Sequence, residues 1–543
     1  MNNAYFQVKA PVNEPVKSYL PDSPEKAALK AELARQLANQ VEIPLIIGGR
    51  EVRTEHKANI ICPHNHKQVL GQYYIAGEKE LLMAIEAAEA ARAEWENMPW
   101  EHRATIFLKA ADLLTGKYRA KLSASCMLGQ SKNTFQSEID VICELADFLR
   151  FNVYFTQEIY KQQPNNSEGV WNRVEYRALD GFVAAITPFN FAAIGGNLCT
   201  APAMCGNTVL WKPSSTAVLA NYYFMQILLE AGLPAGVINF VPCRGVDFGK
   251  VVVPHPKMAG FHFTGSTGVF NDIWKQVSQN IDNYVTYPRL VGETGGKDFI
   301  FAHESADVEA LTCNIVLGAF EYQGQKCSAA SRAYIPESLW PEVKARLETE
   351  ISKLKMGDVC DFTNLVNAVI DKKSFQNIRN YIDYVKESPD AEIIMGGNCD
   401  DSVGYFVEPT VIVAKIPTFK TMVEEIFGPV MTIYVYPNDK LDETLTACDT
   451  ATSYALTGAV FAQDRAAIIK IAKALDHAAG NFYINDKPTG AVVGQQPFGG
   501  SRSSGTNDKA GSAINLYRWM NQRSIKETLV PRTVVNYPYM IEK

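Results

Sequence analysis

The sequence predicts an α/β protein in which two parallel sheets are each covered by helices on both faces. The length of 543 residues is enough for several domains. Hydrophobic residues make up 47% and charged residues 20% of the chain, a composition that excludes a disordered or coiled-coil protein. Short apolar runs alternate with helical stretches, which is typical of parallel strands joined by right-handed crossovers.

The first part of the chain is expected to be an arm followed by helices. Residues 1–22 contain three prolines and no clear period, so we expect them to wrap over a surface. Ser23 then has the position of an N-cap and Pro24 that of the first helical residue, which predicts a helix through about Gln40. The pattern becomes helical again over residues 78–132. Its apolar stripe is formed by Leu82, Ile85, Ala88 and Ala91.

Two alternations of strands and helices follow, and they predict two α/β domains. The first has apolar runs at 181–187, 207–212, 236–242 and 258–264, with a helical stretch at 216–232. The second begins near Leu290, has a helix at 310–322, and has strands expected at 298–302, 331–336, 405–413, 430–436 and 481–486. In such a pair of domains, ligands favour the cleft between them.

Charge, hydropathy and cysteine usage narrow the classes of function. The net charge is -7 and the basic residues are scattered, so nucleic acid is not an expected partner. No stretch of about 18 apolar residues occurs, so we expect no membrane span. The eleven cysteines are thinly spread, which fits reduced thiols in a cytoplasmic enzyme better than a disulfide framework. The N-terminal residues lack a signal-peptide pattern, and the mitochondrial matrix is the alternative location.

Cys327 stands in an unusual context, AFEYQGQKCSAASR, directly after a lysine and a polar Gln-Gly-Gln run. A cysteine is most often a buried, inert thiol. A nucleophilic cysteine needs a lowered pKa or a nearby base, and Lys326 could help electrostatically. A papain-like Cys-His pair is conceivable, but none of the eight histidines stands in a context that marks it as the partner. Taken alone, Cys327 leaves both interpretations open.

Two further polar residues follow predicted strands and have two interpretations each. Asn190, in ITPFNFAAIGGN, could donate to a developing oxyanion or simply cap a helix. Glu293, in VGETGGKD, could be a general base beside glycines that allow close approach of a substrate, or a solvated loop carboxylate.

Three other stretches suggest ligands more weakly. FTGSTG at 263–268 suits a pyrophosphate at a helix start, although it is not the G-x-G-x-x-G fingerprint. Lys212, in WKPSS, could bond ribose hydroxyls or be an ordinary surface lysine. CPHNH at 62–66 offers a Cys and two His at two-residue spacing, but no second ligand pair of that kind appears. A hairpin turn is the favoured interpretation there, and we expect no metal site.

Taken in order, TPFNF, WKPS, FTGSTG, ETGGK, GQKCSA and EEIFGP resemble the aldehyde dehydrogenase superfamily, over about residues 41–505. The resemblance implies a Rossmann-type cofactor domain, an α/β catalytic domain and a small β oligomerisation flap. The implied division is 1–40 as an N-terminal arm and helix, 41–160 with 181–290 as the NAD-binding domain, 291–490 as the catalytic domain, and 161–180 with 520–543 as the flap. The flap resemblance rests on WNRVEYRAL and the tail RTVVNYPYM.

The resemblance also implies roles for individual residues. Cys327 matches the nucleophile, Asn190 the oxyanion donor and Glu293 the base that activates water. The residues implied to bind the cofactor are Thr187, Lys212, Ser215, Gly265, Ser266, Gly268 and Glu425. Ser215 stands where many NAD-preferring relatives carry an acid, so NAD is the expected cofactor and NADP the alternative.

A second set of motifs, including KPTGAVVGQQPFGG and DDSVGYFVEPT, is similar to the branch that oxidises L-glutamate γ-semialdehyde to L-glutamate in proline catabolism. The residues implied to bind that aldehyde are Phe191, Ser328, Gly490, Ala491 and Phe498. Ala491 departs from some members, which have serine there. The alternatives are another semialdehyde dehydrogenase, a CoA-acylating enzyme or a non-catalytic binding protein. A homodimer is expected, as is transient contact with a proline dehydrogenase.

Overall fold

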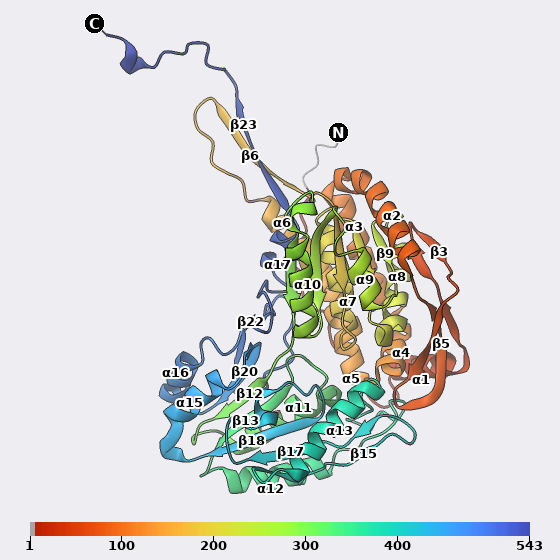
Figure 1. The fold of residues 1–543 in the computed structure, drawn as a ribbon, viewed down its shortest axis with the longest axis vertical. Helices are drawn as coiled ribbons and strands as arrows, with labels where there is room; N and C mark the ends of the chain where they lie inside the picture. Colours follow the sequence, from red (N-terminus) through yellow and green to blue (C-terminus); the bar gives the residue numbers. More distant parts are fainter. Residues whose placement is uncertain (1–5, 543) are drawn as a thin grey trace.

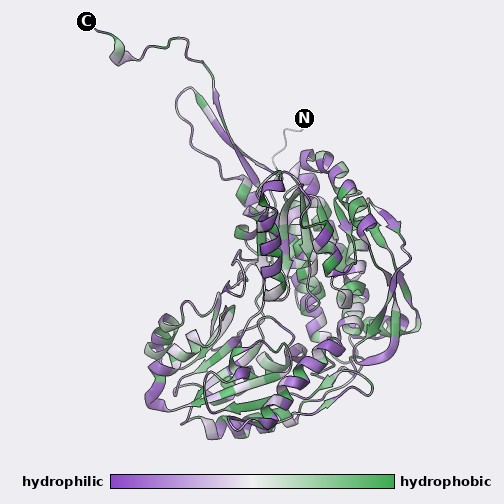
Figure 2. Cartoon of the chain, in the orientation of Figure 1, coloured by the Kyte–Doolittle hydropathy of each residue, from purple (hydrophilic) through white to green (hydrophobic). Residues whose placement is uncertain are grey.

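The protein is described by a computed structural model that covers residues 6–542. Figure 1 shows two lobes, each built on a seven-stranded sheet, and a long two-stranded β ribbon that projects from the upper lobe. Hydrophobic residues concentrate in the sheets, and the outer helices carry hydrophilic stripes (Figure 2). Within the described residues, no helix has both the length and the apolar character needed to cross a membrane.

The first sheet lies in the upper lobe and has the strand order β11-β10-β7-β8-β9-β2-β3. The strands are β2 (Leu45–Ile47), β3 (Arg50–Val52), β7 (Phe182–Ile186), β8 (Val209–Lys212), β9 (Ile238–Phe240), β10 (Met258–Thr264) and β11 (Arg289–Glu293). The run from β11 to β9 is parallel, as the alternation predicts, whereas β2 and β3 add antiparallel strands at one edge. The sheet continues to Glu293, three residues past the boundary expected at 290.

Each face of this sheet packs against its own set of helices. Val183, Ala185 and Trp211 belong to one core. Alternate residues such as Phe182 and Ala184 belong to another. The first core includes α3 (Trp100–Thr115), α4 (Arg119–Gln130), α6 (Leu145–Tyr160), α7 (Ala192–Met204) and α8 (Val218–Ala231). The second includes α2 (Glu78–Asn97), α9 (Gly245–Val251) and α10 (Thr267–Gln279). Strands buried on both faces explain why their sequences are continuously apolar.

The second sheet lies in the lower lobe and has the order β14-β17-β18-β13-β12-β20-β21. Its strands are β12 (Asp298–Ala302), β13 (Ala330–Pro336), β14 (Ala391–Met395), β17 (Thr410–Ala414), β18 (Val430–Tyr436), β20 (Thr457–Phe461) and β21 (Asn481–Ile484). All pairs are parallel except β14 with β17. One face carries α11 (Val308–Phe320) and α12 (Trp340–Ser352). The other carries α13 (Lys372–Glu387), α15 (Leu441–Thr450) and α16 (Arg465–Ala474).

The remaining elements are short or lie at the edges. They are α1 (Pro24–Ala38), β1 (Val41–Ile43), β4 (Lys57–Cys62), β5 (Asn65–Tyr74), α5 (Thr134–Ser137), the π-helix Glu138–Glu144, β15 (Cys399–Asp400), β16 (Phe406–Val407), α14 (Lys420–Val423), β19 (Tyr454–Ala455), β22 (Ser501–Arg502) and α17 (Ala513–Tyr517). As predicted, Ser23 caps α1 by accepting from the Lys26 N–H at 3.3 Å, and CPHNH connects β4 to β5 as a hairpin turn.

The predicted apolar stripe of α2 is right at Ile85 and Ala88 and wrong at Leu82. Leu82 is 41% exposed, and the buried stripe of α2 runs through Leu81, Ala84, Ile85 and Ala88. The helix is rich in alanine, so two adjacent apolar lines satisfy the helical period. Packing of α2 against the first sheet decides between them.

A projecting two-stranded ribbon, the β6–β23 ribbon, pairs β6 (Val170–Arg177) with β23 (Asn521–Thr528), antiparallel along eight residue pairs. Both strands lie within the segments 161–180 and 520–543 that the resemblance implies for the flap. Residues 532–540, which carry part of that resemblance, contain only a short 3₁₀ turn, Pro538–Met540, and extend beyond the ribbon (Figure 1).

Candidate active site

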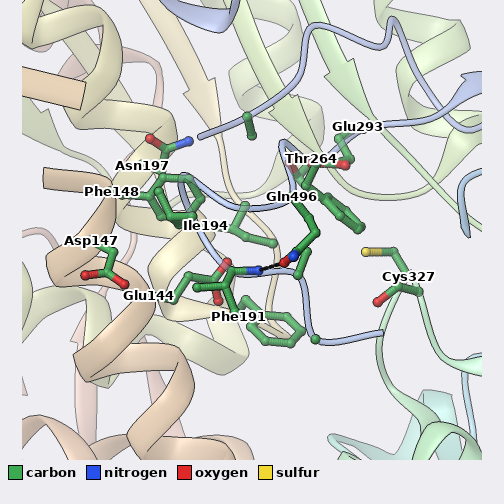
Figure 3. Close-up of a pocket in the computed structure, with 18 of the residues that line it drawn as sticks. Glu144, Asp147, Phe148, Phe191, Ile194, Asn197, Thr264, Glu293, Cys327 and Gln496 are labelled. Carbon is green, nitrogen blue, oxygen red and sulfur yellow. Dashed lines mark hydrogen bonds between the residues drawn. The ribbon is translucent and has the colours of Figure 1, made fainter. Parts of the chain in front are cut away.

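A cavity of about 460 Å³ lies where residues of the two lobes meet, a size typical of small-molecule sites. It brings together seven of the predicted site residues. These are Phe191, Glu293, Cys327, Ser328, Gly490, Ala491 and Phe498. Figure 3 shows the Cys327 sulfur and the Glu293 carboxyl on one side of the cavity, with Glu144 and Asp147 on the other.

The backbone before Cys327 has an uncommon conformation that polar side chains hold in place. Tyr322 and Gln323 have φ of 50° and 55°, in the left-handed region that non-glycine residues rarely adopt. The Gln323 amide donates to the carbonyls of Ser131 and Ala368 at 3.0 and 2.9 Å. The Tyr322 hydroxyl donates to the Gln130 carbonyl at 3.0 Å. These buried hydrogen bonds explain why a polar run precedes the cysteine.

The Cys327 thiol is buried, with 8% of the residue exposed. Burial raises its pKa well above the usual value, and the nearby carboxyl of Glu293 raises it further. Lys326 does not supply the compensating charge, because its Nζ forms a buried ion pair with Glu321 Oε2 at 3.0 Å. The thiol is therefore protonated at neutral pH unless a bound ligand or a base changes its surroundings.

Glu293 is the last residue of β11 and faces the same cavity. Burial raises the pKa of its carboxyl to about 8, while Lys509 lowers that pKa in part. Its Oε1 atom is buried and has no hydrogen-bond partner among the described residues. A carboxyl that titrates near the working pH suits a general base.

The two glycines after Glu293 allow the chain to pass between the cysteine and Glu425. A Cβ atom at Gly295 would lie 2.5 Å from Glu425 Oε2. At Gly296 it would lie 2.2 Å from the Cys327 carbonyl oxygen. The Gly296 N–H donates to Glu425 Oε1 at 2.9 Å, and burial raises the pKa of that carboxyl to about 7. The ETGGK motif thus links three predicted site residues through the backbone.

Asn190 is buried and stands two residues before the start of α7, but it does not line the cavity. Asp140, from the π-helix, caps α7 in its place. The Asp140 carboxylate accepts from the backbone N–H groups of Ala192 and Ala193 at 3.0 and 2.8 Å. It also forms a fully buried ion pair with Lys132 Nζ at 2.6 Å. The capping interpretation of Asn190 is therefore wrong, and its carboxamide is available for another role.

Aromatic and loop residues line the rest of the cavity. Phe191 lies against Lys132, whose Nζ is 4.1 Å from the ring centroid. Residues 487–496, called loop 487–496, follow β21 and line another part of the cavity. In this loop Gly490 has the left-handed conformation, with φ of 96°. At the start of this loop, the hydroxyls of Ser328 and Thr489 hydrogen-bond at 2.8 Å.

The predicted cofactor residues lie outside this cavity; six of them are at one edge of the first sheet, and Glu425 follows α14 in the second lobe. Parallel strands β7, β8 and β10 place their carboxyl ends together. Their ends carry Thr187, Lys212, Gly265 and Ser266, with Gly268 in the first turn of α10 and Ser215 exposed beyond β8. Ligands of open α/β sheets bind at such an edge. The Gly265 N–H donates to the Glu293 carbonyl at 3.2 Å, so this edge adjoins the cavity.

Several of these residues already have structural partners. The Thr187 hydroxyl accepts from Trp211 Nε1 at 3.1 Å. Burial lowers the pKa of Lys212, whose Nζ donates to the Pro213 carbonyl at 3.4 Å. Ser266 precedes α10 without a side-chain cap, which leaves the first amides of that helix suited to an anion.

Sequence reasoning missed two acidic residues of the cavity, and it did not place the expected N-terminal arm at the cavity wall. Glu144 and Asp147 line the cavity, and burial raises the pKa of both carboxyls. The available signal was a pair of carboxylates inside the apolar segment DVICELADFL. The π-helix that carries Glu144 has no local sequence signature, although such bulges are frequent at functional sites.

The CPHNH stretch is not arranged around a metal. Cys62 Sγ contacts His64 Nε2 at 3.0 Å, and His66 Nε2 contacts the Asp401 carbonyl at 2.8 Å. Burial lowers the pKa of His64 to about 4, so this imidazole is neutral. Across residues 6–542, no group of three or more His, Cys, Asp or Glu side chains is placed to hold a metal ion.

Comparison with known proteins places the chain among aldehyde dehydrogenases. The model of the aldehyde dehydrogenase family matches residues 51–525. Proteins of Dictyostelium discoideum and Homo sapiens, both named mitochondrial delta-1-pyrroline-5-carboxylate dehydrogenase, are 56% and 51% identical to this chain. The alignments cover 99% and 97% of this chain, and 97% and 94% of those proteins.

Solved structures agree with the fold. The crystal structure of the delta-pyrroline-5-carboxylate dehydrogenase from Mycobacterium tuberculosis bound with NAD has a TM-score of 0.96 and 49% identity, over 99% of this chain and 100% of that chain. A 1-pyrroline-5-carboxylate dehydrogenase from Thermus thermophilus has a TM-score of 0.90 and 31% identity, over 96% of this chain and 100% of that chain. The predicted fold class and family are confirmed, and the chain belongs to the aldehyde dehydrogenase family.

Proposed function

We propose that this protein oxidises L-glutamate γ-semialdehyde, the open form of Δ1-pyrroline-5-carboxylate, to L-glutamate with NAD. The observation that carries the proposal is one cavity that contains a thiol, a carboxyl that titrates near pH 8, and the loop 487–496. The names of the relatives in Dictyostelium discoideum, Homo sapiens and Mycobacterium tuberculosis support this substrate.

The Cys327 sulfur is the proposed nucleophile. Its proton passes to water, the sulfur bonds to the aldehyde carbon, and the C=O π electrons move to the carbonyl oxygen, which becomes an oxyanion. The Asn190 amide and the Cys327 backbone N–H are the proposed donors to that oxygen. NAD, when bound, supplies the acceptor for the hydride that leaves the carbon, and a thioester on Cys327 remains.

Glu293 is the proposed base for the second half of the reaction. It takes a proton from water, the hydroxide bonds to the acyl carbon, and the C–S bond breaks to release the carboxylic acid and the Cys327 thiolate. The acid then loses its proton to solvent and becomes the carboxylate. The net change is aldehyde, water and NAD⁺ to acid, NADH and protons. A carboxyl with a pKa near 8 is a stronger base, once ionised, than an ordinary glutamate.

The far end of the substrate carries an α-carboxylate and an ammonium. The backbone N–H groups of Gly490 and Ala491 and the hydroxyl of Ser328 are the proposed partners of the carboxylate. Phe191 and Phe498, which both line the cavity, would hold the aliphatic chain between them. The carboxyl of Glu144 suits the ammonium, because a bound cation would favour ionisation of a carboxyl whose pKa burial has raised.

NAD is the proposed cofactor, held at the carboxyl edge of the first sheet. Lys212 and Glu425 would bond its two riboses, the α10 N-terminus with Gly265, Ser266 and Gly268 would hold the pyrophosphate, and Thr187 would lie near the nicotinamide. Ser215 offers no charge against a 2′-phosphate, so some use of NADP is expected.

The test is formation of NADH from L-glutamate γ-semialdehyde, compared with succinate and glutarate semialdehydes and repeated with added CoA. We expect the first substrate to be preferred and CoA to have no effect. Preference for another semialdehyde, or dependence on CoA, would contradict the proposal. Tight NAD binding without turnover of any aldehyde would indicate a non-catalytic protein.

Location and partners remain predictions. We expect a homodimer formed through the β6–β23 ribbon together with the apolar tail that follows β23. A cytoplasmic location is expected, whereas the names of the Dictyostelium discoideum and Homo sapiens relatives include the word mitochondrial and support the alternative. Transient contact with a proline dehydrogenase would be supported by co-purification of the two activities. The structural likeness to a proline utilization A protein, at 28% identity and over 55% of that chain, motivates this test.

A further inference from the structure

The N-terminal arm, defined here as residues 6–22, forms part of the cavity wall. Asn13, Glu14 and Val16 line the cavity that also contains Cys327. The course of the arm is set near its start, where the Val8 N–H donates to the side-chain oxygen of Gln157 at 2.5 Å and the Gln157 amide donates to the Val8 carbonyl at 3.1 Å. The arm therefore forms part of the wall of the site in addition to covering the protein surface.

Asn13 joins helix α6 to loop 487–496 through one carboxamide. Its Nδ2 donates to Asp147 Oδ2 on α6 and to the Val493 carbonyl of the loop, both at 2.8 Å. Its Oδ1 accepts from Gln495 Nε2 of the loop at 2.9 Å. A single side chain thus satisfies groups from two separate parts of the cavity wall.

Glu14 holds the arm in the position that Asn13 needs. The Glu14 N–H donates to Asp147 Oδ1 at 2.8 Å, so Asp147 bonds both residues. The Glu14 carboxylate forms ion pairs with Arg119 at 3.0 Å and Arg150 at 2.7 Å, which together lower its pKa despite partial burial. These contacts of Glu14 therefore hold the neighbouring Asn13 in a fixed position next to loop 487–496.

Loop 487–496 is also held at its start, where the Lys487 N–H donates to Asn314 Oδ1 at 3.0 Å and Thr489 bonds Ser328, and farther along the loop the side chain of Val493 is buried. It lies between β21 and β22 and contains no helix or strand. Within the loop, the Val492 N–H donates to the Gln496 side chain at 3.0 Å and the Gln495 N–H donates to the Val492 carbonyl at 3.0 Å. A loop that binds ligand through backbone N–H groups binds more tightly when it is held in the bound conformation beforehand.

We propose that Asn13 is a positioning residue that holds loop 487–496 against α6 and thereby sets the selectivity for aldehydes that carry an amino-acid head group. The inference rests on the proposed function, because that function assigns the head group to Gly490 and Ala491. Asn13 has no part in the chemistry at Cys327. Its loss should weaken recognition of the head group and leave oxidation of a plain aldehyde unchanged.

The experiment measures kcat/KM for L-glutamate γ-semialdehyde and for pentanal, which lacks the head group. Wild type, Asn13→Ala and the matched control Val12→Ala are compared, since Val12 is 83% exposed beside Asn13. For Asn13→Ala we expect about a tenfold lower kcat/KM with the semialdehyde, through KM, and less than about a twofold change with pentanal. Val12→Ala should match wild type with both substrates. L-Glutamate, the product, should bind Asn13→Ala more weakly in calorimetry.

Equal losses with both substrates, or no loss with either, would overturn the inference, because both results would mean that Asn13 does not act on the head group. A second variant keeps the test independent of folding: Gln495→Ala removes one of the same hydrogen bonds from the exposed side of the loop. The double variant should lose little more than Asn13→Ala alone, and fully additive losses would contradict the coupling. Wild type that oxidises pentanal and not the semialdehyde would refute the proposed function itself.

Discussion

Cys327 and Glu293 face the same cavity, and at the residue scale burial is the main influence on both. It raises the pKa of the thiol and of the carboxyl, and the Glu293 carboxyl raises the pKa of the thiol further. Both are therefore protonated at neutral pH before a ligand binds. Lys509 is the cation that offsets this effect at Glu293. Reactivity then depends on what the substrate and cofactor bring into the cavity.

The raised pKa of Glu293 predicts a pH dependence. The base must be ionised, so kcat should rise as pH increases through about 8 and level off above it. An ordinary glutamate would give no rise in this range, because it is already ionised above pH 6. The pH profile of kcat for wild type and Glu293→Gln checks this. The variant should be slower by about 10²–10⁴-fold and should lack this limb.

Ser215 predicts how cofactor choice can be changed. Ser215→Glu would place a carboxylate where a 2′-phosphate is expected, and like charges repel. We expect kcat/KM with NADP to fall by at least about tenfold, while the value with NAD stays within about twofold. Ser215→Gln is the matched neutral control. Equal effects of both variants on NADP would show that charge at this position is not what selects the cofactor.

At the scale of elements, the start of α7 depends on a group from another helix. The buried pair of Asp140 and Lys132 satisfies two amides of α7, and Lys132 lies between the rings of Phe191 and Tyr322, 4.1 and 4.5 Å from their centroids. A buried charge without its partner is costly. The pair thus connects the π-helix, α7 and the segment before Cys327.

This arrangement predicts the effect of breaking the pair. Asp140→Ala should lower the free energy of unfolding by about 3–5 kcal/mol, because Lys132 is left buried without a counterion. The matched control is the double variant Lys132→Met with Asp140→Asn, which removes both charges and keeps a side-chain acceptor for α7. It should lose clearly less stability in denaturant unfolding. A double variant as unstable as Asp140→Ala would contradict this explanation.

Elements were predictable to different degrees. The strand from Asp298 to Ala302 was expected at those residues, because an apolar run ends at charged or small residues on both sides. The complete buried face of α2 was not predicted correctly, because the alanines of this helix form two adjacent apolar lines that both satisfy the helical period. The Asp140 cap and the contacts of Asn13 could not be read from the sequence, since each joins residues 52 or more positions apart through a polar side chain. Motif order made Cys327 the expected nucleophile where local composition left both interpretations open.

At the scale of the whole molecule, the β6–β23 ribbon and the C-terminal tail extend away from the two lobes (Figure 1). Beyond β23, the tail exposes large apolar side chains. These include Val530 at 83%, Val535 at 88% and Tyr539 at 82% exposed. Exposed apolar groups in such number mark an interaction surface. A second copy of the chain is the expected partner.

Truncation after Thr528 tests that expectation. The shortened chain should be monomeric by light scattering, because it lacks the exposed apolar residues, whereas the full chain should have twice the 60.1 kDa mass of one subunit. The melting temperature of the shortened chain should differ little from that of the full chain if the two lobes fold independently of the tail. A full chain that stays monomeric at micromolar concentration would refute the predicted dimer.

The central claim is that Cys327 carries the acyl group and Glu293 releases it. The most direct test is the intact mass of Glu293→Gln after mixing with NAD and L-glutamate γ-semialdehyde. The account predicts one added glutamyl group, located at Cys327 by peptide mapping, and no addition in the Cys327→Ala, Glu293→Gln double variant. An adduct elsewhere, or NADH formation by Cys327→Ala at the wild-type rate, would contradict the account.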